Sequence, residues 1–174
     1  KLGDPAVQLE LMLRASQLAE AGGDVDLAIQ ALDLALVLPA GGAQAARELA
    51  RVAAKAERWG DCERALRARL KEEKEPSAPL LVDLAKVCDR LGRPADAAAA
   101  LEQALAAGGS EADLAPHLSR LYEAARDARG LEAALGRELA LAEKAGDRER
   151  VARLRLKVSK LQERSSGGDR TKAV

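Results

Sequence analysis

Leucine and alanine recur along this chain with the spacing of an amphipathic helix, and the same pattern returns four times. Each of four segments carries a residue followed by Leu four and eight positions later, which keeps the three side chains near one helical face. The triplets are Ala28, Leu32, Leu36; Cys62, Leu66, Leu70; Ala97, Leu101, Leu105; and Leu131, Leu135, Leu139. Corresponding members lie 34, 35 and 34 residues apart. This constant period predicts a structural repeat.

A further helix precedes each of these segments in the same register. Its apolar positions follow the i, i+3, i+4, i+7 spacing of a helix with one buried face. They are Met12, Ala15, Ser16, Ala19; Ala46, Leu49, Ala50, Ala53; Leu81, Leu84, Ala85, Cys88; and Ala115, Leu118, Ser119, Tyr122. Gly-, Pro- and Asp-containing stretches separate the helices and indicate turns. The chain is therefore predicted to contain four helix–turn–helix units, at 9–42, 43–77, 78–111 and 112–146.

A helix–turn–helix of this length, with a large–small pair in its first helix, resembles the tetratricopeptide repeat (TPR) family. The unit at 78–111 is nearest to that pattern, with Leu81, Leu84-Ala85, Cys88, Ala97, Leu101 and Ala104-Leu105. The resemblance implies an all-α fold, a right-handed α-solenoid of antiparallel helix pairs that forms a TPR-like superhelix. The chain departs from the family pattern where Leu131 replaces a small residue and where Arg69 and Glu138 replace alanine.

The two ends of the chain are expected to differ from the repeats. Residues 1–8 are interpreted as the end of a preceding repeat or a linker, because Pro5 lies 34 residues before Pro39. Near the other end, an apolar stripe predicts a capping helix over 147–164 that covers the last repeat; it consists of Val151, Leu154, Val158 and Leu161. The Ser/Gly-rich residues 165–174 are expected to form a disordered tail.

Stacked repeats curve into a superhelix, and the first helix of each unit is expected to line its concave face. The side chains one step beyond the apolar stripe then point into a partner-binding groove. The candidates are Arg14, Gln17, Arg47, Arg51, Lys55, Lys86, Arg90, His117 and Arg120.

One column of corresponding groove positions is largely basic, and it reads Gln17, Arg51, Lys86, Arg120. Such a stripe could bind an acidic peptide or a C-terminal carboxylate through charge-assisted hydrogen bonds. The alternative is a solvated face whose basic side chains pair with carboxylates of this chain; Glu48, Asp83, Asp89 and Glu123 are the candidates.

Composition narrows the kinds of partner. Lys+Arg and Asp+Glu both number 28, and the chain holds one Trp, one Tyr and no Phe. A balanced charge with so few rings argues against a nucleic-acid-binding protein, which usually has a basic surface or a stacking platform. No stretch approaches the roughly 18 consecutive apolar residues of a membrane span. The expected partner is therefore a protein or peptide, which the basic column allows to be acidic. Neither nucleic acid nor the core of a bilayer is expected as a partner.

No group of residues satisfies the requirements of catalysis. His117 is the only histidine, and Ser119, two residues later on a helix, points to another side. A single histidine also excludes a His-rich metal site, and the Gly-Gly pairs mark turns and lack the pattern of a phosphate-binding loop. We therefore expect no enzyme activity, no catalytic or metal-binding residues and no cofactor.

Three further residues have alternative interpretations. Cys62 and Cys88 occupy repeat core positions and are expected to be small buried hydrophobes; a redox role is the alternative. Trp59 lies at a predicted turn and is expected to pack over the helix ends. A ligand-anchoring role for Trp59 is the alternative, since exposed tryptophans often anchor partners.

These features predict a protein–protein interaction scaffold, a module of a larger protein that binds a peptide or partner protein in its concave groove. One alternative is a structural spacer or self-association segment, and another is a regulatory appendage of an enzyme elsewhere in the full-length chain. The fragment itself is expected to be monomeric. Some TPR proteins hold chaperone C-termini with Lys and Asn side chains, but this chain has no Asn. The Ala/Leu/Arg/Gly-rich composition favours a bacterial source and the absence of a signal-like segment favours the cytoplasm, although a targeting segment could precede Lys1.

Overall fold

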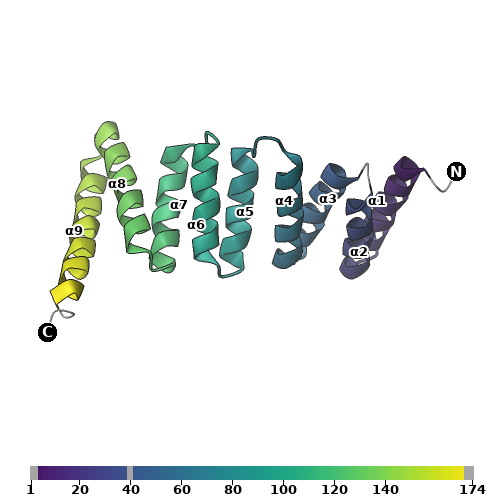
Figure 1. The fold of residues 1–174 in the computed structure, drawn as a ribbon, viewed down its shortest axis with the longest axis horizontal. Helices are drawn as coiled ribbons and strands as arrows, with labels where there is room; N and C mark the ends of the chain where they lie inside the picture. Colours follow the sequence, from purple (N-terminus) through teal and green to yellow (C-terminus); the bar gives the residue numbers. More distant parts are fainter. Residues whose placement is uncertain (1–3, 39–40, 171–174) are drawn as a thin grey trace.

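The computed structural model describes residues 4–38 and 41–170, and this part of the chain contains nine α-helices and no strand. Their bounds are α1 Pro5–Ala21, α2 Val25–Leu36, α3 Gly42–Lys55, α4 Trp59–Glu72, α5 Ala78–Arg90, α6 Pro94–Ala106, α7 Glu111–Ala124, α8 Ala128–Ala145 and α9 Arg148–Arg170. The helices stand side by side in one row, with α1 at one end and α9 at the other (Figure 1).

Each helix packs against the helices that precede and follow it in the sequence. The pairs α1/α2, α3/α4, α5/α6 and α7/α8 form four units, and α9 packs on α8. A row of helix pairs with contacts only between neighbours is the arrangement of an α-solenoid. The predicted all-α solenoid is therefore confirmed.

Local sequence sets the beginnings of several helices. The side chains of Asp4, Asp24 and Asp127 each accept a hydrogen bond from a backbone N–H of the first turn of α1, α2 and α8. Such N-caps satisfy amide groups that have no partner inside the helix. Pro94 begins α6, where its missing N–H costs nothing. These short polar signals explain why the turns fall close to the predicted positions.

Small residues in the repeat columns bring the helices close together. Ala28 and Ala97 are fully inaccessible to solvent, and Cys62 is nearly so. The leucines that follow them four residues later are buried in all four units; they are Leu32, Leu66, Leu101 and Leu135. A core of alanine and leucine is well packed only when backbones approach closely, so these columns determine how tightly the units stack.

The first unit begins earlier than the sequence analysis placed it. Helix α1 begins at Pro5, capped by Asp4, so residues 5–8 belong to this unit and the assignment of 1–8 to a preceding repeat is wrong there. Asp-Pro is also a helix-starting signal, which the 34-residue register had assigned to the end of an earlier unit. Residues 1–3 lie outside the described part of the chain. Within α1, Ala15 is exposed, although the pattern placed it in the core.

The last helix is longer than predicted. Helix α9 continues to Arg170, six residues past the expected end at Arg164. The expected irregular tail therefore does not begin at Ser165, because helical hydrogen bonding continues through a Ser/Gly stretch that contains no proline. Residues 171–174 of the expected tail lie outside the described residues. Trp59, which was expected at a turn, instead begins the first turn of α4.

Candidate partner-binding surface

All nine candidate groove side chains are exposed, and all lie on the first helices of their units. Arg14 and Gln17 come from α1, Arg47, Arg51 and Lys55 from α3, Lys86 and Arg90 from α5, and His117 and Arg120 from α7. The repeat register therefore predicted correctly which helices carry the nine candidates. The contacts that each side chain makes differ from one candidate to the next.

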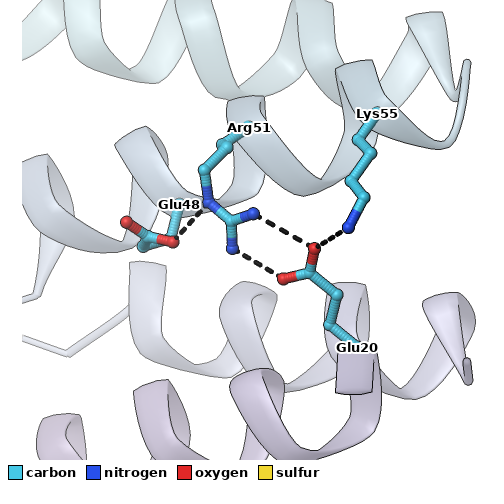
Figure 2. A network of polar contacts seen from close by, with 4 residues as sticks. All are labelled: Glu20, Glu48, Arg51 and Lys55. Carbon is cyan, nitrogen blue, oxygen red and sulfur yellow. Dashed lines mark hydrogen bonds and ion pairs between the residues drawn. The ribbon is translucent and has the colours of Figure 1, made fainter. Parts of the chain in front are cut away.

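Arg51 is held in a network that joins α1 to α3 (Figure 2). Its two terminal nitrogens donate to the two carboxylate oxygens of Glu20 at 2.7 and 3.1 Å, and its Nε donates to Glu48 at 2.9 Å. Lys55 Nζ also donates to Glu20, at 2.9 Å. Hydrogen bonds from Arg51 and then Lys55 lower the pKa of Glu20 to about 2, and the hydrogen bonds of Arg51 to Glu20 and Glu48 raise the pKa of Arg51. A carboxylate with two cationic donors favours its charged form.

The other two basic residues of the column are also paired. Arg120 donates to Asp89 at 2.6 Å, joining α7 to α5 with the same 31-residue separation as Arg51 and Glu20. Lys86 pairs at 3.0 Å with Asp83 of its own helix. It has no acidic partner on α3, because alanine occupies position 54, which corresponds to Glu20 and Asp89. Three of the four carboxylates proposed as partners in the solvated-face alternative, Glu48, Asp83 and Asp89, do pair with the basic column. Glu20, which also pairs, was not among the proposed partners.

The remaining candidates have varied surroundings. The Arg90 guanidinium lies 5.7 Å from the centroid of the Trp59 ring, within the range of a cation–π contact. Trp59 is partly buried and packs against the main core cluster, as the packing interpretation expects. Arg47 Nε donates to the Ala43 carbonyl. Across 4–38 and 41–163, where side chains are described, Arg14, Gln17 and His117 make no hydrogen bond or ion pair.

Two hollows lie along the first helices. The smaller, about 230 Å³, opens between α5 and α7 and is lined by Val82, Ala85, Lys86, Asp89, Leu101, Asp113, Leu114, His117, Arg120 and Leu121. The larger, about 420 Å³, opens between α7 and α9 over α8 and is lined by Pro116, Ser119, Arg120, Glu123, Leu131, Leu135, Glu138, Lys157, Lys160 and Leu161. Arg120 lines both, so the two hollows adjoin.

The larger hollow combines an apolar lining with free cations. Leu131, Leu135 and Leu161 supply the apolar part. Lys157 and Lys160 are exposed, and neither has a hydrogen bond or ion pair among the side chains that the structure describes. The sequence analysis missed both lysines because it treated their helix only as a cap. The available signal was their position beside Val158 and Leu161 of the apolar stripe.

A buried carboxylate stabilises the lining of the same hollow. Ser119 Oγ donates to Glu138 at 2.5 Å, and Arg150 of α9 donates to the other carboxylate oxygen at 3.3 Å. Glu138 occupies a position where the repeat pattern favours alanine. Burial of a charged group is tolerated only when it is paired and hydrogen-bonded. The departure at Glu138 is therefore offset by a partner from α9, which ties the last helix to α7 and α8.

The two cysteines occupy buried positions, and the Arg93 guanidinium donates to the Cys88 sulfur at 3.5 Å. Both are buried and free, so they do not form a disulfide. Burial, followed by the nearby charge of Asp83, raises the pKa of the Cys62 thiol, which lowers its reactivity. In the described ranges, no cluster of His, Cys, Asp and Glu has the composition of a metal site. The same ranges hold no helix that is both long and apolar enough to span a membrane.

No protein-family model matches the sequence, and no curated protein matches it. Among solved structures, a crystal structure of MamA protein matches with a TM-score of 0.58 and 16% identity, over 92% of this chain and 94% of that chain. A second crystal structure of MamA matches with a TM-score of 0.54 and 17% identity, over 87% and 96% of the two chains. These likenesses support a tetratricopeptide-like helical repeat fold. At this identity they define the fold alone.

Proposed function

We propose that this chain is a non-enzymatic protein-interaction scaffold that binds a segment of a partner protein along its first helices. The observation that carries the proposal is the larger hollow, in which an apolar lining lies beside Lys157 and Lys160, two lysines that make no ion pair with any side chain in the described ranges. This hollow suits a peptide better than a small substrate, because it is open to solvent and holds no group of catalytic residues. Together with the adjoining smaller hollow it forms a longer surface along which an extended segment could lie.

The charges of the surface favour a partner segment with carboxylates around an apolar side chain. Arg51 and Arg120 already pair with Glu20 and Asp89, so a ligand would have to compete for them. Among the side chains that the structure describes, no carboxylate competes for Lys157 and Lys160. The apolar side chain would contact Leu131, Leu135 and Leu161, while carboxylates would approach the two lysines. The acidic character predicted for the partner thus depends more on α9 than on the basic column.

A defined set of peptides tests this proposal. Fluorescein-labelled peptides of alternating Glu and Leu, with matched Lys–Leu peptides, are titrated with the chain while anisotropy is recorded. We expect saturable binding of the acidic set and at least tenfold weaker binding after Lys157→Glu with Lys160→Glu. The matched control is Lys71→Glu with Lys74→Glu, which makes the same charge change at exposed positions on and after α4. Equal binding by both variants, or no binding of any acidic peptide, would refute the proposal.

A further inference from the structure

The two hollows along the first helices have corresponding linings. Each residue on the α7 wall of the larger hollow lies 34 residues after one on the α5 wall of the smaller hollow. The pairs are Val82 and Pro116, Ala85 and Ser119, Lys86 and Arg120, and Asp89 and Glu123. On the opposite walls, Lys157, Lys160 and Leu161 of α9 lie 40 residues after His117, Arg120 and Leu121 of α7. Glu123 therefore has the place of Asp89, and Lys160 has the place of Arg120.

The ion pair that crosses the smaller hollow is missing from the larger one. Arg120 of α7 pairs with Asp89 of α5 at 2.6 Å, and both residues line the smaller hollow. Among the described side chains, Glu123 and Lys160 form no ion pair, either with each other or with another residue. Between α3 and α5 the corresponding pair is missing because alanine occupies position 54. At the larger hollow both charged residues are present, and both are left for another partner.

Leu131 offers a physical reason for this difference. The corresponding residues of the other second helices are small, namely Ala28, Cys62 and Ala97. Leu131 lines the larger hollow and packs against a core cluster that includes Leu154 of α9. In a close-packed core, leucine requires more room than alanine between neighbouring helices. This agrees with the volume of the larger hollow, about 420 Å³, against about 230 Å³ for the smaller one.

The other charges that line the larger hollow already have partners. Glu138 accepts hydrogen bonds from Ser119 and Arg150, and Arg120 is paired with Asp89. The charges that remain lie on two walls, with Glu123 on α7 and the two lysines on α9, at the C-terminal end of the row (Figure 1). A purely acidic ligand would satisfy the lysines, but it would leave Glu123 without a partner and bring like charge towards it.

We propose that the larger hollow binds a partner segment that carries a carboxylate and a cation on either side of an apolar side chain. This proposal rests on the scaffold function proposed above and specifies the chemistry of its partner. The carboxylate accepts hydrogen bonds from Lys157 and Lys160. The cation, a Lys or Arg side chain of the partner, pairs with Glu123. The apolar side chain lies between them against leucines of α8, and the segment supplies both charges that the chain does not pair by itself.

A peptide scan measured by fluorescence anisotropy tests this proposal. In a fluorescein-labelled peptide of alternating Glu and Leu, each Glu is replaced in turn by Lys and by Gln. At one position we expect the Lys peptide to bind roughly two- to fivefold more tightly than the Gln peptide, which is the contribution of one exposed ion pair. Gln is the reference because it removes the peptide's own charge at that position without adding a cation.

Variants at Glu123 assign this preference to its carboxylate. Glu123→Gln is expected to abolish the difference between the Lys and Gln peptides, and Glu123→Lys is expected to invert it, so that Glu becomes the preferred residue at that position. The matched control is Glu10→Lys, the same charge change at an exposed position of α1, and it should keep the original preference. Both positions are exposed, so circular dichroism of these variants should remain helical.

Two outcomes would overturn the mixed-charge segment while leaving the scaffold function standing. One is acidic binding in which Lys and Gln peptides bind alike at every position, as expected if Glu123 pairs directly with Lys160 in the free chain. The other is a preference for Lys that survives Glu123→Gln. Absence of binding by every peptide of the set would refute both the scaffold function and this inference.

Discussion

Glu20 shows how the repeat register controls the chemistry of a single group. Its carboxylate lies at the end of α1, one unit before Arg51 and Lys55, and receives three hydrogen bonds from them. The side chains at the corresponding positions 54, 89 and 123 are Ala, Asp and Glu, so only some units can form this contact. The strength of the link between neighbouring first helices therefore varies along the row.

The lowered pKa of Glu20 leads to a prediction about acid stability. Its pKa in the folded chain is about 2, below the ordinary value of 4.5. The ion pairs therefore contribute stability at neutral pH, and this contribution is lost as pH falls from about 4.5 towards 2. Carboxyl ¹³C NMR should show Glu20 titrating near the lower value. Arg51→Gln should raise that midpoint, whereas Arg14→Gln should not; an unmoved midpoint in Arg51→Gln would contradict the assignment.

Gly130 illustrates a contact that the sequence pattern does not reveal. It lies in the first turn of α8, against the ring of Tyr122. A Cβ at this position would come within 2.4 Å of the ring. The absence of a side chain at Gly130 therefore allows α7 and α8 to pack closely at this point. That contact joins residues of different helices, and periodicity within one helix carries no information about it.

At the scale of helices, the small columns control how closely α5 and α6 approach. Ala97 of α6 is fully buried in a core cluster that includes residues of α5, and it lies in the column of Ala28 and Cys62. We expect Ala97→Trp to destabilise the chain by roughly 1–3 kcal/mol or more, because a close-packed core cannot accept the ring without moving backbone. Thermal unfolding followed by circular dichroism measures the effect. Ala99→Trp is the control, since Ala99 is exposed two residues later; equal melting temperatures would show that the register is wrong.

At the scale of the whole molecule, ion pairs between units have a constant direction. In the described part of the chain the carboxylate comes from the earlier unit and the cation from the later one, as in Glu20–Arg51, Glu63–Arg93 and Glu102–Arg137. For Glu63, burial would raise the pKa, but hydrogen bonds from Arg93 and Arg67 outweigh it, and its pKa lies below the usual range. The row of units thus has a direction, because the acidic side of one unit faces the basic side of the next. These charges favour one stacking order of the units.

Reversing the basic column should affect both binding and stacking. Arg51→Glu, Lys86→Glu and Arg120→Glu together should weaken capture of acidic peptides while the chain stays helical. Because Arg51 and Arg120 also join first helices, we expect a loss of about 1–2 kcal/mol in unfolding free energy, since exposed pairs contribute up to about 1 kcal/mol each. Urea denaturation measures the loss. Lys157→Glu with Lys160→Glu should leave stability nearly unchanged, and a larger loss in that variant would refute the assignment of unpaired lysines.

The sequence alone determined the helix content, the period and the buried columns. These follow from side-chain spacing along single helices, and Leu81, Leu84, Ala85 and Cys88 are all buried as their pattern predicts. Corresponding columns also allowed the groove candidates to be placed on the first helices. Residues separated by one period meet the same environment in each unit, so a pattern that repeats is informative about packing.

Only the tertiary structure decided which charges are paired, where the hollows lie and which column of α1 is left exposed. Arg51 meets Glu20 because two first helices lie beside each other, and Lys157 borders a hollow because α9 packs against α8 beside α7. Leu18 fits the repeat pattern as well as Val52 does, yet it is exposed because no described helix packs before α1. Burial depends on what lies across an interface, and that is a property of the assembled chain rather than of any one segment.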